Sequence, residues 1–271
     1  MAGASIGELL QSAGIAAVDA RALLRAALGV DDAYLVAHSA RSPSDRQRDH
    51  FLGWVRRRQA GEPVAYLTGE REFYSIAFKV TPAVLIPRPD TEILVEAALE
   101  RIPAQSPFRV LDLATGSGCV AVAIALQRPR AGVTATDASS AALAVARENA
   151  ARHGVTIDFV ESGWFAALAG RRFDLIVCNP PYVAEGDPHL AEGDLRFEPR
   201  AALLGGPDGL ACIRWIVAHA RAHLEPGGAL LFEHGHDQGK HCRALLERAG
   251  YRDVSAQRDL ADIERVAGGK V

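Results

Sequence analysis

The first sixty residues carry apolar side chains at helical spacing. Between residues 5 and 59 these side chains recur every three or four positions, and the pattern breaks at Gly14, Gly29 and Ser42-Pro43. Such a period is typical of amphipathic helices that pack one face into a core. The pattern therefore predicts a small helical bundle at the start of the chain.

A different pattern begins near Gly61. Residues 72–87, EFYSIAFKVTPAVLIP, are rich in β-branched and aromatic side chains and lie between Gly69 and Pro87. This composition and these boundaries predict a β-hairpin. A helical pattern follows from about Asp90 to Arg101. We expect an N-terminal helical domain over 1–70, and a hairpin linker with the main domain over 71–271.

Strand and helix patterns alternate in the rest of the chain. Short apolar runs predict strands at 109–114, 132–137, 156–160, 173–179 and 227–235, and longer periodic segments predict helices at 117–127, 139–154, 208–224 and 238–250. Two more strands are expected at one edge of the sheet, from residues 251–271. The alternation is typical of an α/β fold, in which helices cover both faces of a parallel sheet.

Composition narrows the classes of function. The 271 residues carry a formal net charge of -3, so the chain lacks the general positive field on which non-specific duplex binding relies. Glu8 and Asp19 interrupt the apolar N-terminus, and no basic segment precedes it, so neither a signal peptide nor a membrane span is expected. Four scattered cysteines without a C-x-x-C pair favour a reduced protein in the cytoplasm.

The first strand of the alternating region ends in a glycine-rich turn. The segment DLATGSGC, residues 112–119, leads directly into a helix, and Gly116 and Gly118 permit close backbone approach to a ligand. The next strand ends in Asp137, whose carboxylate can accept hydrogen bonds from two ribose hydroxyls. The alternative is a structural turn with Asp137 as a helix cap. Together the two features predict a nucleoside-containing cofactor.

S-adenosylmethionine fits this segment better than NAD. A dinucleotide fingerprint requires a third glycine near the start of the helix, where this chain has Cys119-Val120-Ala121. S-adenosylmethionine has no pyrophosphate, and an acidic strand end such as Asp112 suits its ammonium and sulfonium groups. Trp164 is a candidate to stack on the adenine, although a tryptophan here is equally compatible with a core position.

The strand at 173–179 runs into Asn179-Pro180-Pro181-Tyr182, beside the glycine turn if the sheet is parallel. A planar amide or nucleobase nitrogen is a poor nucleophile because its lone pair is delocalised. The Asn179 side-chain oxygen and the Pro180 carbonyl can accept its two N–H groups, orient it and stabilise the charge that develops during methyl transfer. Tyr182 can lie against the planar group. A plain proline turn is the structural alternative.

Several segments resemble one family of enzymes. Asn-Pro-Pro-Tyr after an apolar strand resembles amino-group methyltransferases, both adenine-specific DNA enzymes and protein-glutamine enzymes. The segments at 61–96, 197–210 (FEPRAALLGGPDGL) and 231–240 (LFEHGHDQGK) resemble the peptide chain release factor glutamine methyltransferases, the HemK/PrmC type. The resemblance extends from the helical start to the last strand.

The resemblance implies a Rossmann-like seven-stranded methyltransferase domain that methylates N5 of the glutamine in the Gly-Gly-Gln tip of release factors. It also implies site residues, which we list by role. The cofactor contacts are Ala114, Thr115, Gly116, Ser117, Gly118, Asp137, Trp164 and Asn179; the catalytic residues are Asn179, Pro180 and Tyr182; the substrate contacts are Asn179, Pro180, Pro181 and Tyr182. The chain departs from the family at Ala114, usually glycine, and at Gly163, often aspartate.

Three alternatives stay open. The same catalytic core can act on a glutamine of a ribosomal protein, a choice that the helical domain would make. Adenine methylation of DNA is disfavoured by the net charge and by the lack of an extra segment for base flipping. A non-catalytic scaffold is disfavoured by the intact Asn179 and Tyr182. We expect a monomer that binds release factors and neither membrane nor DNA.

Three polar segments have simpler interpretations. Asp90 or Thr91 is expected to cap the following helix, although the resemblance also places this loop, with Arg88, near the active site. The arginines at 56–58 are expected to form a solvated helix face, with a role in holding an acidic partner surface as the alternative. In EHGHDQGKHC, His234 and His236 would share a strand face, but no companion ligand motif exists, so no metal site is expected.

Overall fold

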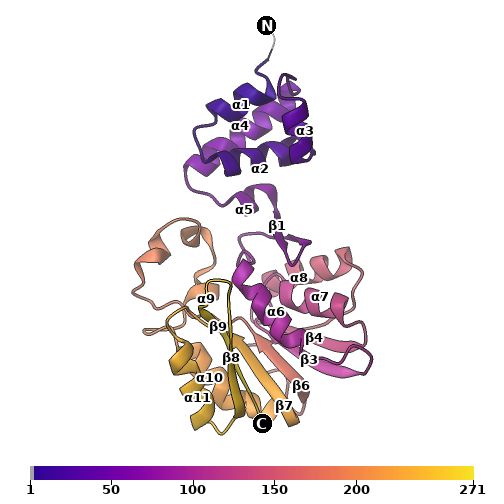
Figure 1. Cartoon of the computed structure of the whole chain (residues 1–271), viewed down its shortest axis with the longest axis vertical. Helices are drawn as coiled ribbons and strands as arrows, with labels where there is room; N and C mark the ends of the chain where they lie inside the picture. Colours follow the sequence, from indigo (N-terminus) through magenta and orange to yellow (C-terminus); the bar gives the residue numbers. More distant parts are fainter. Residues whose placement is uncertain (1–2) are drawn as a thin grey trace. The chain divides into compact units, whose positions relative to one another are not determined.

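The computed structural model describes residues 3–271, and the chain divides into two compact units (Figure 1). The first unit comprises Met1–Glu70 together with His189–Phe197. The second comprises Arg71–Pro188 and Glu198–Val271. A segment that follows Asn-Pro-Pro-Tyr in sequence thus belongs to the helical unit.

A seven-stranded sheet in the order β5-β4-β3-β6-β7-β9-β8 is the centre of the second unit. Its strands are β3 (Phe108–Leu113), β4 (Ala131–Asp137), β5 (Asp158–Glu161), β6 (Phe173–Cys178), β7 (Leu224–Glu233), β8 (Arg252–Arg258) and β9 (Glu264–Lys270). The first five are parallel, whereas β9 runs antiparallel to both β7 and β8. The predicted α/β class with a seven-stranded sheet is confirmed.

Helices cover both faces of this sheet (Figure 1). On one face, α6 (Glu92–Leu99), α7 (Cys119–Gln127) and α8 (Ser140–Arg152) pack with the hairpin of β1 (Glu70–Phe73) and β2 (Ile76–Lys79). On the other face lie α10 (Ala211–Ala220) and α11 (Gly239–Arg248). The short helix α9 (Arg200–Leu203) precedes α10. Each strand of the sheet's centre is therefore buried on both sides, which explains its continuous apolar sequence.

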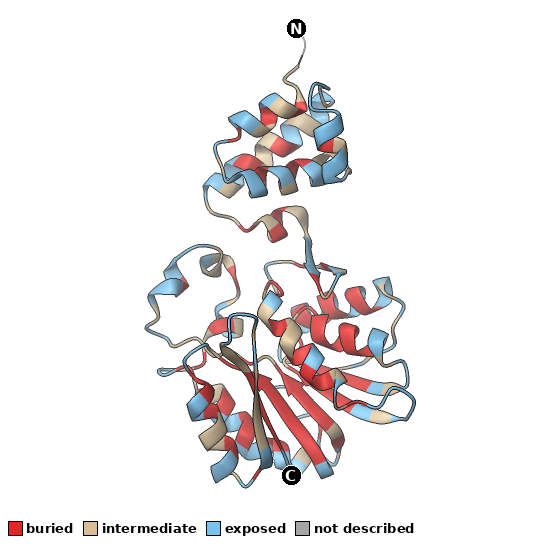
Figure 2. Cartoon of the chain, in the orientation of Figure 1, coloured by how far each residue is buried: buried red, intermediate tan, exposed pale blue. Residues whose placement is uncertain are grey.

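Burial follows this layering, as Figure 2 shows for the central strands and α7. Seven of the nine residues of α7 are buried, so this helix is apolar all round and has no solvated face. Val110 and Val177 point into one apolar cluster, whereas Leu111 and Ile176 point into the other. Within residues 3–271, no helix has the length and apolarity needed to cross a bilayer.

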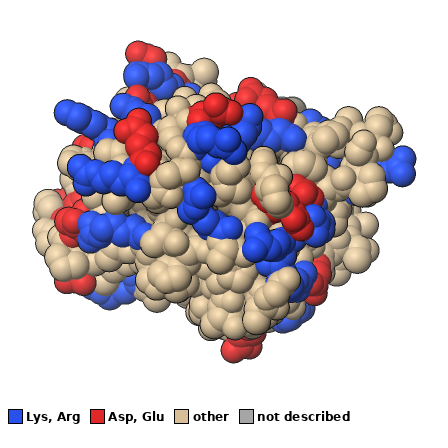
Figure 3. Space-filling model, turned by 90° about the horizontal axis from the view of Figure 1, so that it is seen from below, with Lys and Arg blue, Asp and Glu red and all other residues tan. Residues whose placement is uncertain are grey.

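Acidic and basic side chains are interspersed on the face shown in Figure 3. Many ion pairs join the two signs among the described residues, for example Arg109 with Glu225 at 2.8 Å and Arg171 with Asp158 at 2.8 Å. Such pairs neutralise charge locally.

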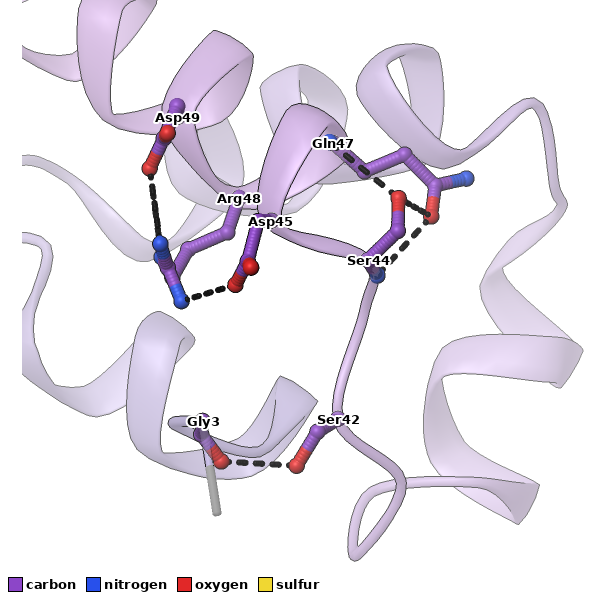
Figure 4. A network of polar contacts seen from close by, with 7 residues as sticks. All are labelled: Gly3, Ser42, Ser44, Asp45, Gln47, Arg48 and Asp49. Carbon is purple, nitrogen blue, oxygen red and sulfur yellow. Dashed lines mark hydrogen bonds and ion pairs between the residues drawn. The ribbon is translucent and has the colours of Figure 1, made fainter. Parts of the chain in front are cut away.

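Five short helices form the first unit: α1 (Ile6–Ser12), α2 (Ala17–Leu28), α3 (Asp32–Ala37), α4 (Asp45–Gln59) and α5 (Val64–Thr68). Leu23, Leu24 and Phe51 are fully buried in its core. Ser44 and Gln47 form a reciprocal capping box at the start of α4, and Ser42 bonds the Gly3 carbonyl beside it (Figure 4). The predicted helical bundle is confirmed.

The arginine cluster of α4 is not simply a solvated face. Arg58 is about three-quarters buried and pairs with Asp19 at 2.7 Å and with Asp194 at 2.9 Å. Arg196 donates to the Ala60 carbonyl at 2.9 Å. These bonds hold residues 189–197 within the first unit, and the expectation for Arg58 was wrong because its acidic partners are distant in sequence.

Asn149 of α8 connects the hairpin to the glycine turn. Its Oδ1 accepts from the Lys79 N–H at 2.8 Å, and its Nδ2 donates to the carbonyls of Lys79 at 3.0 Å and Ser117 at 2.9 Å. We expect Asn149→Ala to lower the free energy of unfolding by about 2–4 kcal/mol, because three backbone groups, two of them partly buried and one buried, lose their partner. Urea denaturation measures this loss.

Glu148→Ala is the matched control on the same helix. The Glu148 side chain is 57% exposed, and the substitution removes its ion pair with Lys79. It should cost no more than about 1 kcal/mol. Equal losses for the two variants would contradict the structural role of Asn149.

Candidate active site

A cavity of about 440 Å³ opens at the carboxyl ends of β3, β4 and β6. Strand order reverses at β3, where α/β sheets usually bind ligands. The predicted site residues that line it are Ala114, Thr115, Gly116, Ser117, Asp137, Trp164, Asn179 and Pro181. Three predicted residues, Gly118, Pro180 and Tyr182, are not among its lining. All lining residues belong to the second unit.

The two glycines of the turn have different roles. Gly116 has φ +56° and lines the cavity with open space around the position of a Cβ. Gly118 has φ +80°, and a Cβ there would lie 3.0 Å from Ala146 Cβ on α8. Gly118 therefore permits helix packing behind the turn, while Gly116 provides the surface that a ligand meets.

Asp137 holds the turn and still presents acceptor capacity to the cavity. Its two carboxylate oxygens accept one backbone N–H each, from Gly116 and from Ser139, both at 2.9 Å. An ionised carboxylate has about four acceptor sites. Two hydroxyl donors can therefore still bind to it.

Asp112 is a buried carboxyl at the bottom of the cavity. Thr115 Oγ1 donates to it at 2.6 Å. Burial raises the pKa of Asp112 to about 7, an effect that the Thr115 bond opposes and that the nearby Asp137 charge increases. A cationic group placed beside Asp112 would favour its ionised form.

Two non-glycine residues of the lining have left-handed backbones. Ala114 has φ +61° and Trp164 has φ +53°. An L-residue with a side chain adopts this region at a cost of about 1–2 kcal/mol, and a glycine at position 114 would be free of this strain. The Trp164 ring also stacks on Trp215, with centroids 5.9 Å apart. At Gly163, a Cβ would meet open space.

Asn179 and Tyr182 are each fixed by hydrogen bonds from other elements. Asn179 Nδ2 donates to Thr91 Oγ1 at 3.1 Å. The Tyr182 hydroxyl donates to Glu233 Oε1 at 2.9 Å, and Gln238 Nε2 donates to the Tyr182 carbonyl at 3.0 Å. The phenol and the backbone of Tyr182 are thus held by the same segment, 233–238.

A glycine makes this arrangement possible. Gly209 has φ +73°, and a Cβ there would lie 2.4 Å from the Tyr182 carbonyl and 2.7 Å from Gln238 Nε2. A side chain at this position would displace Tyr182. Gly209, in the segment GGPDGL, therefore leaves room for the backbone of Tyr182.

The resemblance placed the loop of Thr91 near this site, whereas sequence reasoning did not identify Glu233 or Gln238 as part of it. Glu233 is buried, and burial raises its pKa to about 7, while the Thr91 and Tyr182 side chains lower it. One signal was present: Glu233 ends an apolar strand that pairs with β6, and Cys178 is level with Phe232. This parallel register brings Asn179 and Glu233 to the same edge of the sheet.

The capping expectation for the loop before α6 was wrong. Thr91 is the N-cap residue of α6, but it has a helical backbone and its side chain makes no capping bond. Asp90 pairs with Arg265 at 3.1 Å instead. Arg88 lines the cavity and pairs with the buried Glu198 at 2.5 Å. The loop therefore borders the cavity, as the resemblance implied.

The histidines after β7 do not share a face. The strand ends at Glu233, before both histidines. His234 is buried, with Nδ1 2.8 Å from the Gly235 carbonyl, whereas His236 is exposed. Cys242 is buried in the core. Among residues 3–271, no group of three or more His, Cys, Asp and Glu side chains is arranged to hold a metal ion.

Comparison with known proteins gives consistent matches. Residues 90–194 match the Methyltransferase small domain model, and residues 4–69 match the PrmC N-terminal domain model. A release factor glutamine methyltransferase of Burkholderia pseudomallei is 52% identical, covering 99% of this chain and 96% of that protein. One of Escherichia coli is 46% identical, covering 93% and 91%.

A solved structure with a similar fold is a T. thermophilus 16S rRNA N2 G1207 methyltransferase in complex with AdoMet and guanosine. It has a TM-score of 0.55 and 23% sequence identity, covering 74% of this chain and 49% of that chain. At this identity the likeness concerns the fold alone.

The raised pKa of Glu233 predicts a pH-dependent stability. Between its ordinary value of 4.5 and about 7, the folded protein keeps a proton that the unfolded chain has released. The free energy of unfolding should therefore fall as pH rises through this window, by about 3 kcal/mol from this residue. Glu233→Gln should remove that part of the fall, as measured by urea denaturation at pH 5 and pH 8.

Glu247→Gln, an exposed change on α11, controls for the loss of one acidic group. It should keep the wild-type difference between the two pH values. Parallel behaviour of Glu233→Gln and wild type would show that Glu233 does not carry the dependence.

Proposed function

The chain belongs to the release factor glutamine methyltransferase family, and we propose that it transfers a methyl group from S-adenosylmethionine to N5 of a glutamine in the Gly-Gly-Gln motif of peptide chain release factors. One observation carries the proposal. The Asn179 side chain lines the same cavity as the glycine turn and Asp137, so an amide-binding group and a nucleoside-binding group share one site.

The residues present fit the cofactor. Asp112 is a buried carboxyl that a cationic ligand would stabilise, and Asp137 retains acceptor sites for two hydroxyls. S-adenosylmethionine supplies an electrophilic methyl group on a sulfonium sulfur. We assign Asp137 to the ribose, residues 114–118 to the amino acid part and Trp164 to the adenine.

Asn179 and Pro180 do the positioning in this proposal. The Asn179 side-chain oxygen and the Pro180 carbonyl each accept one N–H of the substrate amide, which directs its nitrogen at the methyl group. The same acceptors stabilise the positive charge that builds on nitrogen as the N–C bond forms and the S–C bond breaks. The methylated nitrogen then releases a proton to water, so a strong general base is not required.

Pro181 and Tyr182 frame the substrate. Pro181 lines the cavity and has no N–H that could compete for the acceptors. Tyr182 keeps its proton over the physiological range, because burial beside Glu233 raises its pKa. Its neutral ring can lie against the planar amide and exclude water.

We assign recognition of the release factor to the helical domain over 1–70 and catalysis to residues 71–271. Its substrates are translation factors, so we place its action in the cytoplasm, with the chain acting as a monomer. No direct contact with DNA is part of the proposal.

Transfer of radiolabelled methyl tests the reaction and the substrate together. We expect label on a purified release factor and none on the variant in which the tip glutamine is alanine, because only the glutamine offers a side-chain amide nitrogen. An isolated ribosomal protein and duplex DNA are parallel substrates. Label on either of these in place of the release factor would overturn the proposed substrate.

Asn179→Ala and Asp137→Ala should separate chemistry from cofactor binding. Asn179→Ala removes an acceptor used by the reacting amide, so kcat at saturating cofactor should fall by about 100-fold or more. Asp137→Ala removes the ribose acceptor, so the Kd measured by calorimetry should rise at least about tenfold. Unchanged turnover in the first, or unchanged Kd in the second, would refute that residue's assignment.

A further inference from the structure

Thr91 has a hydrogen-bonding role that its position in sequence does not explain. It occupies the N-cap of α6 without capping the helix, and only 2% of its surface is exposed. Its hydroxyl instead accepts from Asn179 Nδ2 at 3.1 Å. The buried Thr91 hydroxyl, in the lining of the cavity, therefore binds the side chain of Asn179, which is the proposed amide-binding group.

The direction of this bond decides what Asn179 presents to a substrate. An asparagine amide has one acceptor end and one donor end, and rotation by 180° about χ2 exchanges them. With Nδ2 bound to Thr91, Oδ1 is left to accept an N–H. In the exchanged orientation, Nδ2 would face the N–H groups of the substrate and repel them.

The bond to Asn179 defines the role of the Thr91 hydroxyl. Asn179 Nδ2 is the donor, so the Thr91 oxygen acts as its acceptor. A hydroxyl oxygen has two lone pairs and can accept while its own proton is turned elsewhere.

Tyr182, at the other end of the Asn-Pro-Pro-Tyr motif, is held by a different buried group, since its hydroxyl donates to Glu233 Oε1 at 2.9 Å. Asp90 and Arg265 are the other charged groups that act on Glu233. They pair with each other at 3.1 Å, so Arg265 is engaged with Asp90.

We propose that Thr91 is a positioning residue that holds the Asn179 amide with Oδ1 toward the substrate nitrogen. This inference rests on the proposed function for its consequence in catalysis. The orientation itself is a property of the protein and can be observed without turnover.

Thr91→Val and Thr91→Ser form the matched pair. Valine keeps the shape and removes the hydroxyl, whereas serine keeps the hydroxyl and removes one methyl group. We expect Thr91→Val to lower kcat for release factor methylation by about 10–100-fold, because a misplaced acceptor no longer aligns the amide. KM for the release factor and the calorimetric cofactor Kd should stay within about twofold to threefold, and Thr91→Ser should restore most of kcat.

The composition of the chain permits a direct readout of the amide. Asn149 and Asn179 are the only asparagines in the sequence. Protein made with side-chain ¹⁵N-asparagine therefore shows two NH₂ groups by NMR. Asn149 is an internal control, since its Nδ2 is held by the carbonyls of Lys79 and Ser117 rather than by Thr91.

In Thr91→Val, the Asn179 NH₂ signals should move upfield and exchange faster with solvent, while the Asn149 signals stay in place. Thr91→Ser should resemble wild type. Unchanged Asn179 signals in Thr91→Val, or equal shifts of both asparagines, would overturn the inference.

The two proposals fail separately. If wild type methylates no release factor, the proposed function fails, and the NMR result still decides the orientation. If wild type is active and Thr91→Val keeps its kcat, the positioning role is wrong and the proposed function stands.

Discussion

The catalytic unit depends on the parallel pairing of β6 with β3 on one side and β7 on the other. This pairing places the end of β6, where Asn179 begins, between the glycine turn after β3 and Glu233 at the end of β7. Because all three strands are buried on both faces, their register is set by apolar packing. The positions of the polar groups at the strand ends follow from that register.

Placing polar groups at a buried edge has a cost in stability. Asp112 and Glu233 are both enclosed enough for their pKa values to rise to about 7. Asp112, Ala114 and Trp164 line the cavity, and the last two adopt left-handed backbones there. Part of the strain and desolvation of the chain therefore lies at the cavity, whereas the apolar clusters on the two faces of the sheet supply the stability that offsets them.

The segments that suggested the family by resemblance have physical explanations in the structure. The segment 231–240 supplies Glu233 and Gln238, which hold the phenol and the carbonyl of Tyr182. The segment 197–210 supplies Glu198 for Arg88 and the glycine that leaves room beside Tyr182. These motifs thus support the Asn-Pro-Pro-Tyr backbone, and a substitution in them would act on the site through Tyr182 or Arg88.

The sequence by itself determined the α/β class, the helical start, the strand order along the chain and the cluster formed by residues 114–117, Asp137 and Asn179. Those features are local: periodicity sets the elements, and parallel strands bring their carboxyl ends to one edge. Only the tertiary structure decided which side chains Thr91, Arg58 and Glu233 bind. The side-chain partners lie 39 or more residues away in sequence, as with Asn179 for Thr91 and Asp19 for Arg58. A hydroxyl before a helix has the same local pattern whether it caps that helix or holds a distant amide. Packing made that choice by giving Thr91 a helical backbone and placing β6 beside it.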